Sequence, residues 1–250
     1  MATGKRLIKS GLGVLLATLV SGNLLADTVR IESGDRRVNL VELYTSEGCS
    51  SCPPAEAWLN GFIKDEGLWQ QVIPLAFHVD YWDYIGWQDR YAQPRFSDRQ
   101  YRYQREGGIR TVYTPGVLVN GEEWRRWFRQ RPALANETVG ALSLEVADNR
   151  VKARFEPVKK PAGGLRLHLA VVAFGLESDV AAGENRGRDL RHDFVVVGLN
   201  ASDSTDLQWQ SPLPEIKQTD AKRLALVAWV SEPERQAPLQ AAGGWLPTSE

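Results

Sequence analysis

Cys49 and Cys52 are the two cysteines of this 250-residue chain, and together they form a Cys-x-x-Cys motif. This spacing lets the second sulfur attack a mixed disulfide at the first, so the pair can alternate between dithiol and disulfide. A thiolate at a helix N-terminus faces free N–H groups, which lower its pKa and make it a nucleophile near neutral pH. We therefore expect Cys49 to be the exposed attacking thiol and Cys52 to be the buried resolving thiol.

Two other interpretations of the cysteine pair stay open. A purely structural disulfide would close a very small loop and would constrain little of the unfolded chain, which disfavours it. His78 could instead complete a metal site with Cys49 and Cys52, because two soft sulfurs and one imidazole suit Cu(I). The redox interpretation requires no cofactor, whereas this alternative predicts a copper-binding or copper-chaperone protein.

The segments around the cysteines have the patterns of strands and a helix. Residues 38–44 and 71–80 are apolar and β-rich, which predicts two strands. Pro53 and Pro54 directly follow the motif, and the first turn of a helix tolerates proline, so we expect a helix there. Residues 114–119 predict a third strand, which ends at the strong Asn-Gly hairpin signal.

Glu42 lies inside the first of these apolar strands, seven residues before Cys49. A carboxyl group buried beneath two sulfurs would have a raised pKa, which would suit proton transfer to and from Cys52. An outward-facing strand glutamate is an equally good interpretation. Glu42 is therefore a candidate catalytic residue with both orientations open.

Pro115 is a candidate catalytic residue and Thr114 a candidate substrate-binding residue, because a Thr-Pro pair opens the third predicted strand. The order of strand, Cys-x-x-Cys helix, strand, insertion and Thr-Pro strand resembles that of thioredoxin, where such a proline is cis and lies beside the cysteines. We therefore expect a cis Thr114–Pro115 bond, although an ordinary trans proline at a strand start is the alternative. The Thr114 backbone would then be open to a substrate strand beside Cys49.

Tyr81 and Trp82 belong to the densest aromatic cluster of the sequence, and they could bind a polypeptide or a hydrophobic molecule near the cysteines. A core or domain interface is the alternative. His168 alternates with leucines and is predicted to face outward. Residues 183–192 are a polar run that forms either a solvated loop or a loop folded toward the site.

The pattern changes after about residue 132, where alternating segments predict strands and little helix. The sequence therefore predicts an α/β fold with a thioredoxin-like sheet and flanking helices at residues 27–135, with an insertion at 81–110. A β-rich C-terminal region at residues 136–250 would follow, either as a sandwich-like unit or as an extension of the first sheet.

Residues 1–26 have the pattern of a secretory signal peptide, with Lys5, Arg6 and Lys9 before a short apolar run. Removing these three cations changes the formal net charge from -1 to -4, because the segment contains no acid. A mildly acidic chain disfavours nucleic acid as a partner, and no later run is long enough to span a membrane. We expect a periplasmic or secreted bacterial protein, where a disulfide can persist.

Residues 43–55 resemble the opening motif of the bacterial secreted family called domain of unknown function 1223. Residues 78–83, 112–115 and 183–185 also resemble its pattern. The resemblance implies an exported, thioredoxin-like protein without implying a reaction. Together with the cysteines it leads us to expect a thiol–disulfide oxidoreductase that acts on protein thiols or on a redox partner protein. Copper binding and a non-catalytic binding module are the alternatives.

Overall fold

The computed structural model describes Met1 and residues 28–216 and 219–247, and these residues form mainly β-structure. Of these described residues, 42% are in strands and 12% are in helices. The predicted signal peptide at residues 1–26 lies almost wholly outside the described residues. Among the residues described, no helix is long and apolar enough to cross a membrane.

A large sheet forms the centre of the molecule, and it has eight strands within the described residues. In spatial order these strands are β14 (Pro238–Trp245), β13 (Arg223–Ser231), β8 (Leu165–Phe174), β11 (Val195–Ser204), β3 (Val72–His78), β2 (Asn39–Thr45), β4 (Gly116–Val119) and β5 (Glu122–Glu123). Strands from both sides of the predicted boundary at residue 135 therefore share one sheet. The two groups meet where β11 pairs in parallel with β3 at Val195 and Ala76.

The predicted thioredoxin-like α/β fold with flanking helices is wrong. The motif order around the cysteines describes β2, α1 (Pro53–Asn60), β3 and β4. Four further strands from beyond residue 164 continue this sheet, and much of its area is covered by strands rather than helices. Local patterns predicted the elements near the cysteines, but they carried no information about which distant strands would join them.

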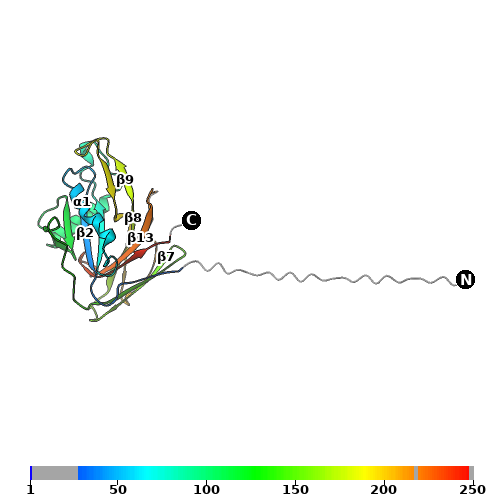
Figure 1. Ribbon diagram of the computed structural model, residues 1–250. Helices are drawn as coiled ribbons and strands as arrows, with labels where there is room; N and C mark the ends of the chain where they lie inside the picture. Colours follow the sequence, from blue (N-terminus) through cyan, green and yellow to red (C-terminus); the bar gives the residue numbers. More distant parts are fainter. Residues whose placement is uncertain (2–27, 217–218, 248–250) are drawn as a thin grey trace.

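A small sheet packs against one face of the large sheet. Within the described chain it contains β1 (Val29–Glu32), β6 (Gly140–Ala147), β7 (Arg150–Pro157) and β12 (Gln208–Pro212), all antiparallel. Buried and more exposed residues alternate along β6 and β7, as expected for strands with one covered face. Their inward apolar side chains form a core with residues of β8, β13 and β14. In Figure 1 the small sheet lies below the large one, near the label β7.

β2 and β3 are buried along their whole length and run parallel, and α1 connects them. Such continuous apolar strands are typical of parallel sheets that are covered on both faces. A short 3-10 helix (Gly61–Lys64) follows α1, and a second (Asp83–Ile85) precedes α2 (Pro94–Arg105). Both α-helices begin with proline, which suits a position where backbone N–H groups lack helical partners.

The two α-helices lie on opposite faces of β2. Thr45 of β2 donates a hydrogen bond to Glu56 of α1, whereas Glu42 of the same strand contacts Arg99 of α2. Residues an odd number of positions apart on a strand point to opposite faces, which explains this division. One strand therefore supplies side chains to two separate interiors.

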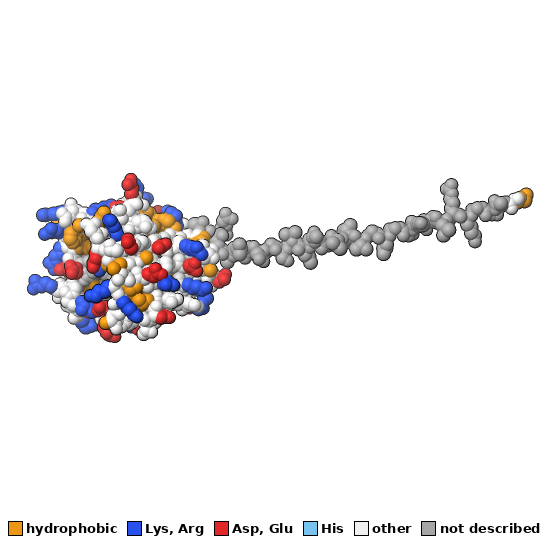
Figure 2. Space-filling model, turned by 90° about the horizontal axis from the view of Figure 1, so that it is seen from below, with side chains coloured by type: hydrophobic (Ala, Val, Ile, Leu, Met, Phe, Trp, Pro, Cys, Tyr) orange, Lys and Arg blue, Asp and Glu red, His pale blue; other side chains and the backbone are white. Residues whose placement is uncertain are grey.

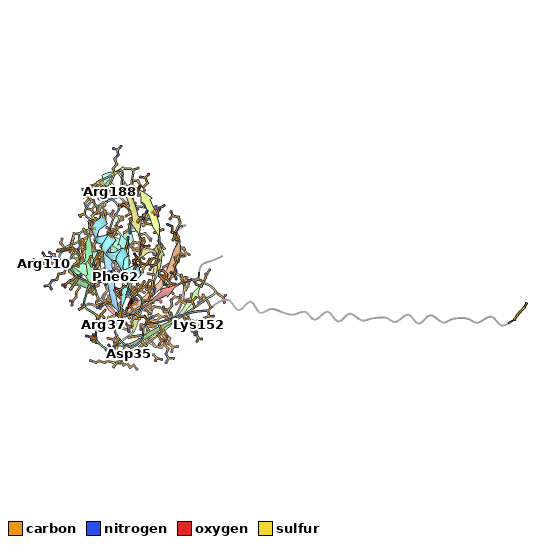
Figure 3. The ribbon with its side chains drawn as sticks, viewed as in Figure 1. Asp35, Arg37, Phe62, Arg110, Lys152 and Arg188 are labelled. Carbon is orange, nitrogen blue, oxygen red and sulfur yellow. A yellow bond between two sulfur atoms is a disulfide. The ribbon has the colours of Figure 1, made fainter. Side chains whose placement is uncertain are left out.

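β9 (Leu176–Asp179) and β10 (Asp189–His192) form a two-stranded ribbon at the top of Figure 1, above α1. The chain between them contains Arg188, which Figure 3 places at the opposite end of the molecule from Asp35 and Arg37. Near that other end, Gln240 of β14 accepts a hydrogen bond from the backbone N–H of Val38 and donates one to the carbonyl of Gly140. This buried amide joins the C-terminal strand to the starts of β2 and β6.

Basic and acidic side chains are interspersed on the face shown in Figure 2. Orange apolar patches on that face are small and separated by charged side chains. A surface of this kind gives no strong field of one sign.

Candidate functional site

The cysteine pair follows β2 and begins α1, and the two sulfurs form a disulfide. Cys49 and Cys52 are both buried, with 1% and 0% of their surfaces exposed. The prediction of an exposed Cys49 is therefore wrong for the disulfide form. The exposed residues of the motif are Ser50 and Ser51, and the Ser51 hydroxyl lies 3.4 Å from the Cys49 sulfur.

The loop between β9 and β10 covers the disulfide. The Asn185 side-chain amide donates hydrogen bonds to the carbonyls of Glu47 (2.8 Å) and Cys49 (3.0 Å). Glu184 Oε2 accepts hydrogen bonds from the Ser50 backbone N–H (3.0 Å) and hydroxyl (2.6 Å), and both bonds lower the pKa of the Glu184 carboxyl. Of the two interpretations of residues 183–192, the structure has the loop folded toward the cysteines.

A buried cluster of ionisable side chains lies next to the disulfide loop. Its members are Glu47 between β2 and α1, Glu56 in the first turn of α1, His78 at the end of β3, Asp89 before α2 and His192 at the end of β10. None of the five is more than 5% exposed. Buried charges are costly unless they are paired, so this group requires an explanation.

His192 lies between two carboxylates. Its Nδ1 is 2.5 Å from Glu56 Oε2, and its Nε2 is 3.2 Å from Glu47 Oε1 without the alignment of a hydrogen bond. Burial favours the neutral imidazole, but Glu56 and Glu47 outweigh it and raise the pKa of His192 to about 10. The Thr45 hydroxyl donates to the other oxygen of Glu56 at 2.5 Å.

His78 has a single carboxylate partner. Its Nδ1 lies 2.7 Å from Asp89 Oδ2, and Asp89 also accepts the backbone N–H groups of Glu47 and Tyr91. Burial opposes both charges, yet the attraction between them raises the pKa of His78 and lowers that of Asp89. His78 Nε2 is buried and has no hydrogen-bond partner among the described residues.

Glu42 is buried as one of the two interpretations expected, but its partners belong to α2. Arg99 binds both of its carboxylate oxygens, at 2.7 and 2.9 Å, and the Tyr103 hydroxyl donates to it at 2.6 Å. Arg99 also donates to Gln236 at 2.7 Å. Because Glu42 points away from the face of β2 that contacts α1, the structure gives no support to its predicted role in proton transfer to Cys52.

The expected cis bond between Thr114 and Pro115 is confirmed. The Thr114 hydroxyl accepts a hydrogen bond from the indole N–H of Trp82 at 2.7 Å. Trp82 in turn packs closely against Gly48. A Cβ atom added at Gly48 would lie only 3.2 Å from the Cβ atom of Trp82. The Thr-Pro turn and the aromatic cluster are thus connected to the residue next to Cys49, and direct approach of Pro115 to the sulfurs stays a prediction.

Tyr81 is half-buried, and its hydroxyl donates a hydrogen bond to Gln100 of α2 at 3.0 Å. It therefore contributes to the packing of α2.

His168 was expected to face outward, and that prediction is wrong. The side chain is buried, stacks on Trp229 and forms a hydrogen bond with Ser231. Alternation along β8 failed as a guide because both faces of this central strand are covered.

The predicted copper set of Cys49, Cys52 and His78 stays a prediction. The two sulfurs are bonded to each other, and His78 shares the cluster with Glu56 and His192 instead.

Three residues of the cluster, Glu47, Glu56 and Asp89, were not predicted from the sequence. The adjacency of two acids to the Cys-x-x-Cys motif was a usable signal, whereas nothing local indicated that His192 would reach His78.

The fold and the site together define a class of mostly-β proteins in which a Cys-x-x-Cys disulfide lies beside a buried histidine–carboxylate cluster. A family model described as "Protein of unknown function (DUF1223)" matches residues 40–231. Because this match spans most of the chain, the chain belongs to that family. No curated protein matches it.

Two solved structures are similar in fold. One is a protein from Agrobacterium tumefaciens, solved by X-ray crystallography, with 23% sequence identity and a TM-score of 0.59 over 84% of this chain and 94% of that one. The other is HBP35 of Porphyromonas gingivalis, with 12% identity and a TM-score of 0.56 over 86% of this chain and 76% of that one. At these identities the likeness concerns the fold alone.

Proposed function

We propose that the protein is an exported thiol–disulfide oxidoreductase that exchanges its Cys49–Cys52 disulfide with protein thiols. The observation that carries the proposal is the disulfide itself, which joins the loop after β2 to the N-cap residue of α1 beneath a loop bound by a few polar contacts. A bond across two residues constrains little of the unfolded chain, so stability alone is a poor reason for it.

The exchange would proceed through a mixed disulfide. A thiolate of the partner attacks the Cys49 sulfur, a bond between the partner and Cys49 forms, and Cys52 leaves as a thiolate. A second partner thiolate then attacks the partner's own sulfur and releases Cys49. The partner gains a disulfide, and this protein gains two electrons and two protons as a dithiol; the reverse sequence reduces the partner.

Local groups support Cys49 as the sulfur that partners attack. The helix dipole of α1 favours a thiolate in front of its first turn, although Pro53 and Pro54 offer no N–H groups there. The Ser51 hydroxyl, 3.4 Å from the Cys49 sulfur, can donate to a thiolate at that position. Ser50 and Ser51 are the exposed entry to the motif, and Glu184 would have to release Ser50 before a partner reaches the sulfurs.

The test uses the mature chain and a reduced peptide dithiol. Cys49→Ser should abolish exchange, while Cys52→Ser should accumulate a mixed disulfide at Cys49 that mass spectrometry of proteolytic fragments locates. Ser202→Ala, at a half-buried position of β11 where the hydroxyl bonds Ser211, is the control outside the site and should exchange as the wild type does. Exchange that persists in Cys49→Ser, or a wild-type disulfide that resists a large excess of dithiol in the folded protein, would overturn the proposal.

A further inference from the structure

Three side chains of the buried cluster converge from separate parts of the fold. Glu56 of α1, His78 of β3 and His192 of β10 each place one ligand atom within 4.8 Å of the ligand atoms of the other two. All three side chains are at least nine-tenths buried. Two imidazoles and one carboxylate are a ligand set that zinc and other first-row divalent metals use in proteins.

Both histidines have a further carboxylate beside one ring nitrogen, which is hydrogen-bonded in His78 and close without hydrogen-bond alignment in His192. Asp89 lies 2.7 Å from Nδ1 of His78, and Glu47 lies 3.2 Å from Nε2 of His192. A carboxylate on the far nitrogen is the usual outer partner of a metal-binding histidine, because it fixes the tautomer and the ring orientation. These contacts leave Nε2 of His78 and Nδ1 of His192 for the interior of the cluster.

Glu56 has the same division between its two oxygens. Thr45 donates to Oε1 at 2.5 Å, and Oε2 lies 2.5 Å from Nδ1 of His192. The Thr45 hydroxyl thus orients the carboxylate from outside the cluster. Hydrogen bonds from outside the cluster therefore position His78 and Glu56, and Glu47 lies behind His192. Each of the three side chains directs one atom inward.

Nε2 of His78 is the atom that most needs a partner. It is fully buried, and no described residue donates to it or accepts from it. Buried polar atoms are nearly always paired, and an unpaired one in a native fold requires a specific cause. A metal ion bound by this nitrogen would remove the deficit, whereas a purely structural hydrogen-bond network would leave it.

We propose that Glu56, His78 and His192 bind one divalent first-row transition-metal ion, with Zn²⁺ as the probe that tests it. On binding, the ion replaces the proton held between His192 and Glu56, and the charged form of His78 also loses its Nε2 proton. Both protons go to solvent. Three protein ligands leave a fourth position for water. The set contains no sulfur, so its ligands are the same whether Cys49 and Cys52 are oxidised or reduced, and the proposal goes beyond the proposed function.

The experiment measures metal binding by the mature, disulfide-containing protein. The chain is stripped with a chelator and titrated with Zn²⁺ and with Co²⁺, and bound metal is counted by mass spectrometry. We expect one ion per chain, and a visible Co²⁺ spectrum without the near-ultraviolet band that sulfur ligands produce. His78→Ala and His192→Ala should each weaken binding at least 100-fold, and Asp89→Asn, which alters only an outer partner, by about 10- to 100-fold.

His168→Ala is the matched control, since it removes a buried histidine that stacks on Trp229 outside the cluster, and it should bind metal as the wild type does. Circular dichroism checks the fold of every variant. The proposal is overturned if the wild type binds no stoichiometric ion, if His78→Ala binds as tightly as His168→Ala, or if the Co²⁺ spectrum contains the sulfur band. The wild-type count and spectrum decide the matter even if the histidine variants fail to fold.

Discussion

Two buried ionic networks lie on opposite faces of β2. On the α2 face, Glu42 and Arg99 form a two-point ion pair, and Tyr103 and Gln236 bond to its remaining groups. On the α1 face, the histidine–carboxylate cluster leaves His78 Nε2 without a partner among the described residues. In the first network the charged groups of Glu42 and Arg99 have hydrogen-bond partners within the protein. The second network contains a buried nitrogen that a bound ligand would pair.

The largest expected effect comes from breaking the completed network. Arg99→Ala leaves Glu42 buried without its cation and should lower the free energy of unfolding by about 3–5 kcal/mol. The double variant Arg99→Met with Glu42→Leu removes both charges and should recover most of that loss. Urea unfolding followed by fluorescence measures both, and a single-variant loss below about 1 kcal/mol would contradict the assignment of Arg99 as the essential partner.

A smaller effect should distinguish the second network through its ligand. Zn²⁺ at 100 times its dissociation constant should raise the free energy of unfolding of the wild type by about 2.7 kcal/mol. Arg99→Met with Glu42→Leu should show the same increase, since it leaves the cluster intact, and His78→Ala should show none. Thermal unfolding with and without Zn²⁺ measures this, and an equal shift in His78→Ala would show that the stabilisation arises elsewhere.

His168, which like Arg99 contacts the ring of Trp229, should make the stability of the protein depend on pH. Burial and the positive charge of Arg99 lower the pKa of His168 well below its usual value. Below about pH 6.5 the unfolded chain therefore binds a proton that the folded chain excludes, so stability falls as pH falls through this window. The difference in unfolding free energy between wild type and His168→Gln should change by about 1.4 kcal/mol per pH unit there.

Urea unfolding from pH 7.5 to 5 measures that difference. Above about pH 6.5 the two proteins should differ by a constant amount. A difference that does not change with pH would mean that the folded protein protonates His168 as readily as the unfolded chain does.

The smallest effect concerns the loop over the disulfide. Glu184→Ala removes both hydrogen bonds to Ser50 and should speed reduction of the disulfide by dithiothreitol roughly five- to tenfold. Glu177→Ala, an exposed glutamate on neighbouring β9, is the control and should react at the wild-type rate. Trapping of free thiols at timed intervals gives the rates, and equal rates in all three proteins would show that the loop does not limit access.

The parts of the molecule that the sequence predicted correctly depend on neighbouring residues. The helix beginning after Cys52 and the cis bond at Pro115 follow from short motifs, and both are present. The burial of Glu42 was one of two interpretations. Its partner Arg99 is 57 residues away, and nothing in the sequence near Glu42 indicated that the two would pair. A motif reports its own conformation better than it reports its tertiary partners.

The fold and the cluster depend on pairings between residues that are distant in sequence, and the sequence did not reveal these pairings. The sequence left open whether the C-terminal strands form a sandwich-like unit or extend the first sheet, and four of them extend it. No local pattern indicates that β11 will pair with β3. Without that pairing there was no reason to place His192 beside His78. The cluster of histidines and carboxylates is therefore a product of the topology of the large sheet rather than of any contiguous motif.

The side-chain amide of Gln240 makes contacts that bear on the rate of folding. It joins β14 to Val38 across 202 positions of sequence, and it also bonds the carbonyl of Gly140. Contacts of such high contact order form slowly, since the entropy of closing a long loop is lost before the contact stabilises anything. A chain made from its N-terminus can therefore form this contact only after its last strand has been made.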